Sequence, residues 1–505
     1  MKRTDAVFLA GAAQALADVR SAGSCPNSTV NLDTLGALLR LLQHDMDTEF
    51  HVRHFARGLE LMRQGLQALG NSGVTVEGDL AADVRRLPQG LSPDWGTELL
   101  TTSHDHLQRL LGRITAKLAS RKLELTKNRS FFTDLGEWEN EFYAHLIKPV
   151  SLRAVDGHTA KLDAESIQAY LRRRFPDEGN LRVANVHRMS GGYGRATALI
   201  ELESPLFGTR ELVLRAELPV SILTLQGIDI TTEFRVLKLA FQNGIPAPEP
   251  LLLESGHNET GVRFVIVRRL PGKNVGSAYT LSESLSPRLL ENLVAGLVAI
   301  HTIDLRKQAS LVRPTHLQAW MEDSSTTQAV ARWIEMWWQY TCSSGVESPL
   351  LAVAYTWLRD NISEVPDPPQ LLHSDYGFGN LLIENDQVTA VLDWEATHLG
   401  DPAEEVGWLI YSLRGTVTEA EILRLYERAG GSSVSDYRLR YFDVFTVVKL
   451  ATCGLVALQK YKDIPGSDPA FCLLASLSIE PFTRQIPAMI ARAEAAKGGG
   501  AASGS

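Results

Sequence analysis

The sequence has few features of a protein that is stabilised by disulfides or by a structural metal, or of one that binds nucleic acid. Its 505 residues include four cysteines (Cys25, Cys342, Cys453 and Cys472), and no two of them form a CxxC pair. Structural zinc and a disulfide framework are therefore not predicted, and a reducing cytoplasmic location is expected. The 50 basic and 59 acidic residues give a net charge of −9, which argues against a dedicated nucleic-acid-binding surface.

Long apolar runs and internal repeats are also missing. No uncharged apolar run reaches the roughly 18 residues that a membrane span needs. With 44% hydrophobic and 22% charged residues, the composition is that of a folded protein and excludes a disordered or collagen-like chain. At about 100–200 residues per domain, the length predicts two or three domains. We expect neither a membrane nor a nucleic acid as a partner.

The first part of the chain, residues 1–150, is predicted to be a helical domain. Apolar residues recur at a spacing of three to four from Thr34 to Leu69, which is typical of amphipathic helices, and the glycines at 70 and 73 end the pattern. Further helices are expected over residues 101–125 and 138–147. Residues 151–161, which include an Asp-Gly pair, are predicted to be a linker.

The residue pattern changes after the linker. Residues 162–272 are predicted to form a small β-rich lobe, which begins with a helix that Asp163 caps and that runs to Arg174. Residues 273–490 are mainly helical in pattern, and residues 491–505 have the composition of a flexible tail. The β-rich runs of the small lobe cover residues 181–187, 196–202, 211–217, 251–253 and 262–268, with a helix over 231–243.

The most informative stretch is a strand-rich interruption of the helical part. His373, Asp375 and Asn380 form an HxDxxxxN pattern, and Asp393 follows Asn380 by 13 residues at the end of an apolar run. Two apolar strands joined by residues 384–387 predict a hairpin. That hairpin brings Asn380 and Asp393 together at one end.

This set of polar residues fits phosphoryl transfer from ATP. The reaction needs a carboxylate that orients or deprotonates the acceptor hydroxyl, and oxygen ligands that hold Mg²⁺ against the phosphates. We predict that Asp375 is the base, that Asn380 and Asp393 hold the metal, and that His373 braces the loop. The alternative is a polar hairpin whose buried carboxylates serve only as caps.

These motifs resemble the aminoglycoside phosphotransferase/choline kinase family over about residues 165–485. The segment from His398 to Trp408 resembles the branch found attached to, or alongside, acyl-CoA dehydrogenases, whose members phosphorylate hydroxyacyl-CoA thioesters. The resemblance implies an α+β fold, with a bilobal protein-kinase-like phosphotransferase domain preceded by an all-α N-terminal domain. It also implies ATP and Mg²⁺ as cofactors, and a faint compositional likeness suggests that residues 1–150 are an accessory domain.

The small lobe supplies further candidates. Ser190, Gly191 and Gly192 lie in a Ser-Gly-Gly-Tyr-Gly stretch that resembles the family's nucleotide-covering loop. Small residues let backbone N–H groups approach phosphates. A plain hairpin turn is the alternative.

The resemblance implies roles for five more residues. Arg215 stands where kinases usually have a phosphate-binding lysine, and Glu233 is its expected ion-pair partner. Arg268 and Leu270 lie in the expected interlobe hinge, where the family often has Met-Glu instead of two arginines. Glu395 is expected either to reach a second metal or to support the catalytic loop.

The sequence thus predicts a small-molecule kinase that acts on a hydroxyl group, with a hydroxyacyl-CoA or a related metabolite as the preferred substrate. An aminoglycoside is the alternative within the same chemistry. A non-catalytic, nucleotide-binding scaffold is the alternative of another class, and only the arginine at position 215 favours it. A protein kinase is disfavoured because no activation segment separates Asp393 from Asp401. The oligomeric state is not predicted.

Overall fold

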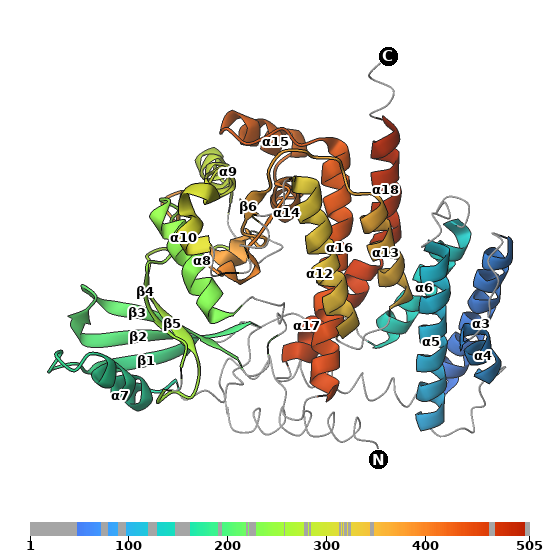
Figure 1. Cartoon of the computed structure of the whole chain (residues 1–505), viewed down its shortest axis with the longest axis horizontal. Coiled ribbons are helices and arrows are strands. Elements are labelled where there is room, and N and C mark those ends of the chain that lie inside the picture. Colours follow the sequence, from blue (N-terminus) through green and yellow to red (C-terminus); the bar gives the residue numbers. More distant parts are fainter. Residues whose placement is uncertain are drawn as a thin grey trace. The chain divides into compact units, whose positions relative to one another are not determined.

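The computed structural model describes residues 48–71, 79–88, 97–119, 129–146, 162–189, 194–218, 221, 229–256, 258–276, 281, 284–312, 315, 317, 321, 325–343, 348–463 and 470–499. The chain divides into two compact units. The helical unit comprises Met1–Val155, Ile334–Ile362 and Val444–Ser505, and the sheet unit comprises Asp156–Trp333 and Ser363–Asp443. A helical region precedes the sheet-containing part, so the predicted α+β class is confirmed (Figure 1).

The helical unit contains the N-terminal helices together with segments from much later in the chain. Residues that the sequence analysis assigns to the large lobe, 334–362 and 444–490, are grouped in this unit. The C-terminal parts of α12 (Thr326–Ser343) and α16 (Asp436–Asp463) belong to it. Its other described helices are α3 (Thr48–Asn71), α4 (Asp79–Arg86), α5 (Thr97–Ala119), α6 (Arg129–Leu146), α13 (Pro349–Asp360), α17 (Ala470–Thr483) and α18 (Ile486–Gly499).

Regular apolar spacing builds the core of this unit. Buried side chains of α3, α5 and α6, among them Leu59, Leu111 and Trp138, pack together with Val353 of α13. Helix α6 begins nine residues before the predicted position, because Phe131, Phe132 and Leu135 extend the apolar spacing into the core. The predicted helical residues 34–47 and 120–125 lie outside the described residues.

Helix α16 is the described helix with the most membrane-like composition. Its segment Asp436–Tyr461 is long and apolar enough to cross a membrane, judged by length and composition alone. However, 78% of the most apolar window is buried inside the structure. This degree of burial is typical of the core helix of a soluble protein.

The small lobe of the sheet unit is an antiparallel sheet with the strand order β1-β2-β3-β5-β4. As predicted, Asp163 caps α7 (Ala164–Arg174) by accepting a hydrogen bond from the backbone N–H of Ser166. Helix α8 (Ile230–Gln242) follows β3 and packs against β4 and β5. The strands are β1 (Val183–Met189), β2 (Arg195–Leu206), β3 (Thr209–Glu217), β4 (Pro250–Glu254) and β5 (Phe264–Arg268).

The two faces of this sheet differ in chemistry. Ala198 and Leu214 are directly paired on β2 and β3, and both belong to the apolar core that includes Tyr170 of α7. Because side chains alternate along a strand, the neighbouring pair, Thr197 and Arg215, points to the opposite face. We call this second face the Arg215 face. It is the face of the small lobe that carries charge.

The large lobe holds the predicted hairpin. Strands β7 (Leu381–Glu384) and β8 (Gln387–Val391) pair antiparallel, and Asn385 and Asp386 turn the chain with positive φ angles of 52° and 62°, as the favoured two-residue hairpin turn requires. The remaining described elements are α9 (Pro287–His301), η1 (Leu305–Gln308), α10 (Ala309–Val312), β6 (Gln370–Leu372), η2 (Phe378–Asn380), η3 (Trp394–Ala396), β9 (His398–Gly400), α14 (Ala403–Ser412) and α15 (Glu419–Arg428).

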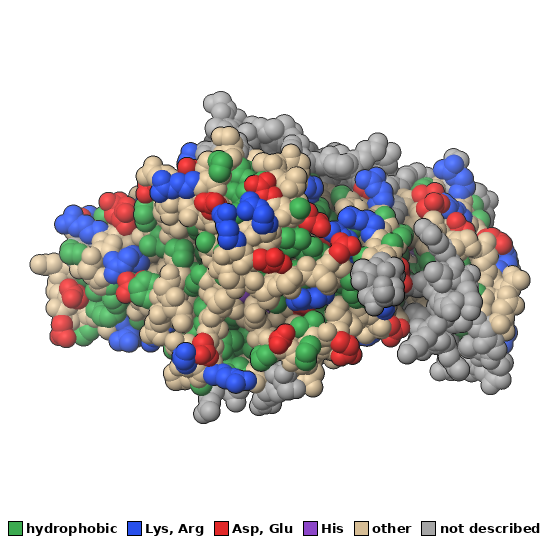
Figure 2. Space-filling model, turned by 90° about the horizontal axis from the view of Figure 1, so that it is seen from above, with side chains coloured by type: hydrophobic (Ala, Val, Ile, Leu, Met, Phe, Trp, Pro, Cys, Tyr) green, Lys and Arg blue, Asp and Glu red, His purple; other side chains and the backbone are tan. Residues whose placement is uncertain are grey.

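The surface charge is mixed. On the face that Figure 2 shows, the described Lys and Arg side chains are interspersed with Asp and Glu, without a continuous patch of either sign.

A buried carboxylate ties α6 to α13 within the helical unit. Glu139 is fully buried and accepts hydrogen bonds from the Ser348 hydroxyl and from the backbone N–H of Leu350, the latter at 2.8 Å. The Ser348 hydroxyl oxygen in turn accepts a hydrogen bond from the N–H of Leu351. The N-terminus of α13 is thus satisfied by a negatively charged group, which the helix dipole favours.

We expect Glu139→Gln to destabilise the helical unit by about 1–3 kcal/mol, since an amide NH₂ then faces buried donors. Glu141→Gln on the same helix is the control. Glu141 is 54% exposed and pairs with Arg57, so its loss changes stability by less than about 1 kcal/mol. Urea unfolding of the full chain measures both variants, and equal midpoints would contradict the role given to Glu139.

Candidate functional site

The predicted catalytic loop lies between β6 and β7 and is held by its own side chains. The Asn380 amide Nδ2 donates to the Asp375 carboxylate Oδ2 at 2.7 Å and to the Asp375 carbonyl at 3.1 Å. Asp375 is half-buried. The structure therefore brings together the proposed base and one proposed metal ligand, while their chemical roles remain predictions.

His373 connects this loop to the segment that carries Asp393. Its Nδ1 accepts a hydrogen bond from the backbone N–H of Asp375 at 3.2 Å, and its Nε2 lies 2.8 Å from the carbonyl oxygen of Leu392. Since Nδ1 accepts, Nε2 carries the proton and donates to Leu392. Burial lowers the pKa of His373, which favours this neutral form. His373 is thus positioned to brace the loop rather than to exchange protons.

Glu405 of α14 is a loop anchor that the sequence analysis missed. Its buried carboxylate accepts hydrogen bonds from the backbone N–H groups of His373 and Ser374, at 3.1 and 2.6 Å. It also lies 2.9 Å from Nε2 of His301. Burial alone would raise its pKa, but the hydrogen bond and charge interaction with His301 hold the pKa of Glu405 below its ordinary value. The only sequence signal was an acidic pair, residues 404 and 405, in an otherwise apolar helix.

Asp393 lies where the predicted hairpin places it. It follows β8 with a left-handed backbone (φ 62°), and the N–H of the preceding Leu392 donates to the Asn380 carbonyl at 2.8 Å. The Asp393 side chain is 33% exposed. The two proposed metal-binding segments are therefore joined backbone to backbone at one end of the hairpin.

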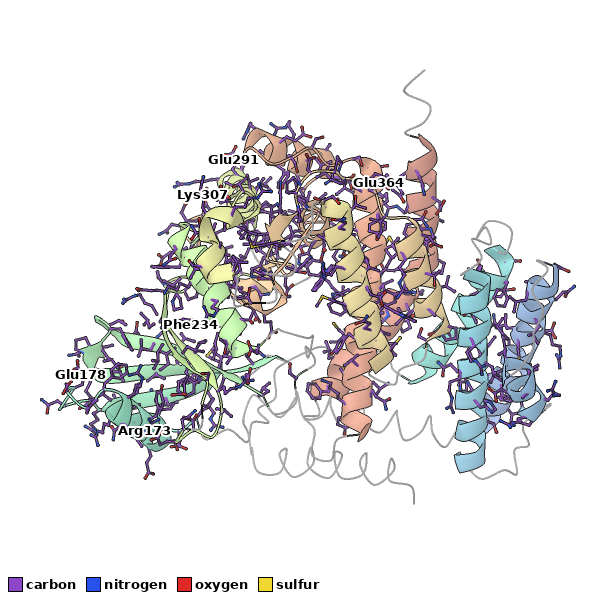
Figure 3. The ribbon with its side chains drawn as sticks, in the orientation of Figure 1. Arg173, Glu178, Phe234, Glu291, Lys307 and Glu364 are labelled. Atoms are coloured by element: carbon purple, nitrogen blue, oxygen red, sulfur yellow. The ribbon has the colours of Figure 1, made fainter. Side chains whose placement is uncertain are left out.

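Arg215 and Glu233 form the expected ion pair. The Arg215 Nε donates to Glu233 Oε1 at 2.6 Å, and its Nη2 donates to Asp393 Oδ1, also at 2.6 Å. Burial alone would lower the pKa of Arg215, but the charges of Glu233 and Asp393 raise it above its usual value. Arg215 therefore remains charged and connects the small lobe to the metal-binding segment. Figure 3 labels Phe234, the residue that follows Glu233 on α8.

Glu395 lies in a different environment from the one expected of a metal ligand. It is buried against Gly194, where a Cβ atom would lie 2.2 Å from Glu395 Oε1. Its Oε2 lies 3.6 Å from Nη1 of Arg195, the first residue of β2. Burial and the charge of Asp393 raise the pKa of Glu395 to about 8. Arg195 was not among the predicted site residues, because the glycine-rich pattern was interpreted only up to Gly194.

Of the remaining nucleotide-binding candidates, the structure describes Arg268 and Leu270. Ser190, Gly191 and Gly192 lie outside the described residues. The Arg268 side chain donates to Glu249 at 2.7 Å and to the Phe207 carbonyl at 3.1 Å, so these contacts hold it within the small lobe, apart from the charged cluster. Leu270 is half-buried just after β5. The hinge role of residues 264–272 stays a prediction.

The end of the predicted hinge is attached to the β7–β8 hairpin. The Thr389 hydroxyl donates to the Pro271 carbonyl at 2.7 Å. Gly272 has a φ of 109°, and a Cβ atom there would lie 2.4 Å from Thr389 Oγ1. Both the backbone conformation and the close approach therefore require glycine at this position.

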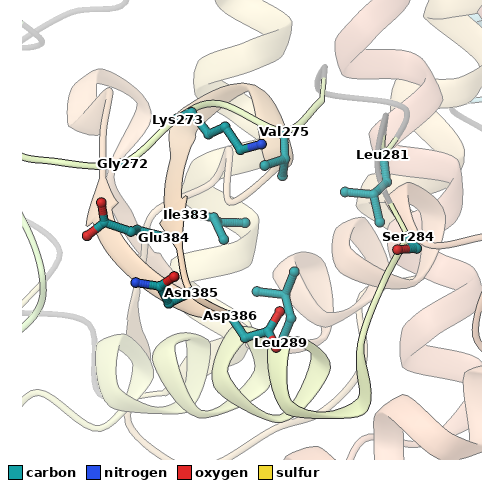
Figure 4. A pocket seen from close by; sticks show the side chains of 10 residues that line it. All are labelled: Gly272, Lys273, Val275, Leu281, Ser284, Leu289, Ile383, Glu384, Asn385 and Asp386. Atoms are coloured by element: carbon teal, nitrogen blue, oxygen red, sulfur yellow. The ribbon is translucent and has the colours of Figure 1, made fainter.

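A cavity of about 580 Å³ lies next to this attachment. Figure 4 shows its lining, which carries the charged residues Lys273, Glu384 and Asp386. The other lining residues are Gly272, Val275, Leu281, Ser284, Leu289, Ile383 and Asn385. Neither Asp375 nor Asp393 lines it. Because the charges around it are of both signs, the cavity does not identify a ligand class.

The donor set of the cluster fits magnesium bound together with phosphates. Asn380 and Asp393 offer amide and carboxylate oxygens, the hard ligands that Mg²⁺ prefers. Within the described ranges, no group of three or more His, Cys, Asp or Glu residues is arranged to hold a metal ion. Mg²⁺ commonly takes only one or two protein ligands and completes its shell with water and substrate phosphates, so this incomplete set is sufficient.

Comparisons with known proteins agree with this arrangement. Residues 208–441 match the phosphotransferase enzyme family. Acyl-CoA dehydrogenase family member 11 of Rattus norvegicus is 26% identical over 255 residues, which cover 49% of this chain and 31% of the rat protein. Hygromycin-B 4-O-kinase of Escherichia coli is 25% identical over 197 residues, which cover 39% of this chain and 57% of the kinase.

A solved structure supports the fold. A proposed aminoglycoside phosphotransferase from Ralstonia eutropha is 21% identical and superimposes with a TM-score of 0.50, covering 65% of this chain and 98% of that chain. The chain spans only about a third of the length of the rat relative. The family match over residues 208–441 includes Arg215, Asp375 and Asp393, and the solved structure confirms the expected kinase-like fold. Residues 208–441 of this chain are therefore similar to the phosphotransferase enzyme family.

Proposed function

We propose that the chain transfers the γ-phosphoryl group of ATP to a hydroxyl group of a small molecule, with Mg²⁺ as the metal. One observation carries this proposal. Asp375, Asn380, Asp393 and Arg215 come from three separate segments of the sequence and are joined by hydrogen bonds into one cluster. Such a cluster holds the oxygen ligands, the carboxylate base and the cation that phosphoryl transfer needs.

In the proposed mechanism the chain contributes mainly positioning and charge. Asp375 accepts a hydrogen bond from the acceptor hydroxyl and aligns it for in-line attack, while Asn380 keeps the carboxylate oriented. Arg215 binds phosphate oxygens with its planar guanidinium. Magnesium, when bound between Asn380 and Asp393, neutralises charge on the transferring group.

Arg215 occupies only part of the Asp393 carboxylate. In the present structure its Oδ1 accepts a hydrogen bond from Arg215 at 2.6 Å. A carboxylate has two oxygens with about four lone pairs, so the rest of the Asp393 carboxylate would hold Mg²⁺, and Arg215 would turn toward the phosphates of bound ATP. Glu233 remains its partner and keeps the guanidinium close to the site.

For the acceptor we propose the hydroxyl of a hydroxyacyl-CoA or a related metabolite. The acyl-CoA dehydrogenase relatives support this choice, since family member 11 of the rat is 26% identical to this chain over 255 residues. The hygromycin-B kinase relative supports an aminoglycoside as the second candidate. Both relatives are only about a quarter identical to this chain.

We expect Asp375→Asn to lower acceptor-dependent ATP consumption by about 10²- to 10⁴-fold, the usual contribution of a general base. Asp177→Asn, at an exposed position after α7, is the matched control and retains wild-type activity. The assay uses 3- and 4-hydroxyacyl-CoAs, their free acids and aminoglycosides as acceptors.

The panel also separates the candidate functions. Turnover confined to CoA thioesters supports the preferred substrate, and turnover on aminoglycosides supports the second candidate. If the wild type binds ATP but no acceptor stimulates its consumption, the chain is a nucleotide-binding scaffold and the proposal fails.

We expect Asp393→Asn to raise the Mg²⁺ concentration needed for half-maximal activity by at least about 10-fold, since even outer-shell changes cost 10- to 100-fold in metal affinity. The measurement is a Mg²⁺ titration of ATP consumption at fixed ATP, with Asp177→Asn again as the control. An unchanged midpoint would show that Asp393 is not a metal ligand.

A further inference from the structure

Arg195 is a second buried arginine on the Arg215 face of the small lobe. In the register of β2 and β3, Thr197 pairs with Arg215, and Arg195 precedes Thr197 by two residues. Because side chains two apart on a strand point to the same side, Arg195 and Arg215 share a face. Arg195 also comes directly after the glycine-rich stretch that ends at Gly194.

The two arginines are held by the same carboxylate. Arg195 Nε donates to Glu233 Oε2 at 3.0 Å, and Arg215 Nε donates to Glu233 Oε1 at 2.6 Å. Each oxygen of Glu233 therefore fixes one guanidinium. Asp393 balances the second positive charge through Arg215, at 2.6 Å, so a metal ion bound to Asp393 would leave the arginine pair with a charge that another anion has to meet.

The rest of the Arg195 side chain is incompletely satisfied. Nη1 donates to the Gly194 carbonyl at 3.2 Å and lies 3.6 Å from Glu395 Oε2. The side chain is 5% exposed, and Nη2 is buried without a hydrogen-bond partner within the described part of the structure. A buried donor without an acceptor costs about 1–3 kcal/mol, so a site that keeps one has a reason beyond packing.

We propose that Arg195 is a second triphosphate-binding residue, which acts with Arg215 as an arginine pair on the phosphates of ATP. The free Nη2 supplies a donor that an anionic phosphate oxygen would satisfy, and guanidinium groups bind such oxygens strongly. The position after Gly194 and the face shared with Arg215 favour the nucleotide over the acceptor as the ligand. This inference rests on the proposed function.

The alternative is that Arg195 only neutralises the buried carboxylates of Glu233 and Glu395. The two roles differ in what they do to ligands. A phosphate-binding cation strengthens the binding of ATP but not of adenosine, whereas a structural cation affects both through the shape of the lobe.

The test is calorimetric binding of Mg-ATP and of adenosine to the full chain, for the wild type, Arg195→Gln and Arg195→Lys. Arg182→Gln is the control, because Arg182 forms a surface ion pair with Glu203 in the same sheet and is 64% exposed. We expect Arg195→Gln to weaken ATP binding by about 10- to 100-fold, the loss of a hydrogen bond to a charged group. The adenosine affinity of Arg195→Gln should stay at the wild-type value. The ATP affinity of Arg195→Lys should fall between those of the wild type and Arg195→Gln.

The outcomes separate this inference from the proposed function. Unchanged ATP affinity in Arg195→Gln, or an equal loss for ATP and adenosine, overturns the inference and leaves the proposed function standing. A wild type that binds no ATP overturns both. If Arg195→Gln does not fold, Arg195→Lys keeps the charge and decides the question through the same ratio of ATP to adenosine affinity.

Discussion

The buried carboxylate of Glu233 is the interaction on which the small lobe's charged face depends. It is 1% exposed and holds one arginine on each oxygen. Breaking such a buried pair typically costs about 3–5 kcal/mol, because a charge is left without a partner in a low-dielectric region. Through Glu233, helix α8 is connected to β2 at Arg195 and to β3 at Arg215.

The catalytic loop has an equivalent anchor in the large lobe. Glu405 holds two consecutive backbone N–H groups of the loop, and His373 connects the loop to the segment before Asp393. Ser374 and Asp393 both have positive φ angles, 70° and 62°, which are uncommon for residues other than glycine. The hydrogen bonds from Glu405 and His373 therefore hold a backbone that the local sequence alone does not favour.

Local patterns predicted much of the fold and of the site. The cap at Asp163, the positions of the small-lobe strands and the hairpin between Asn380 and Asp393 follow from patterns within short segments, so they are visible in one sequence. Arg195 and Glu405 were missed because their partners lie 38 and 32 residues away. An isolated arginine after a glycine-rich stretch, or an acidic pair in a helix, does not reveal which distant group it meets.

The helical unit is assembled from segments that lie far apart in the sequence, and this has a consequence for how the chain folds during synthesis. Its core includes Val353 of α13, and Glu139 meets groups that lie 209 and 211 residues further along the chain. Contacts at such separations form late, because the intervening chain must first be made. The N-terminal helices thus leave the ribosome before the segments that complete their unit. The apolar side chains that contact α13 remain exposed while residues 156–333 of the sheet unit are synthesised. A chaperone that acts on this protein would meet those side chains first.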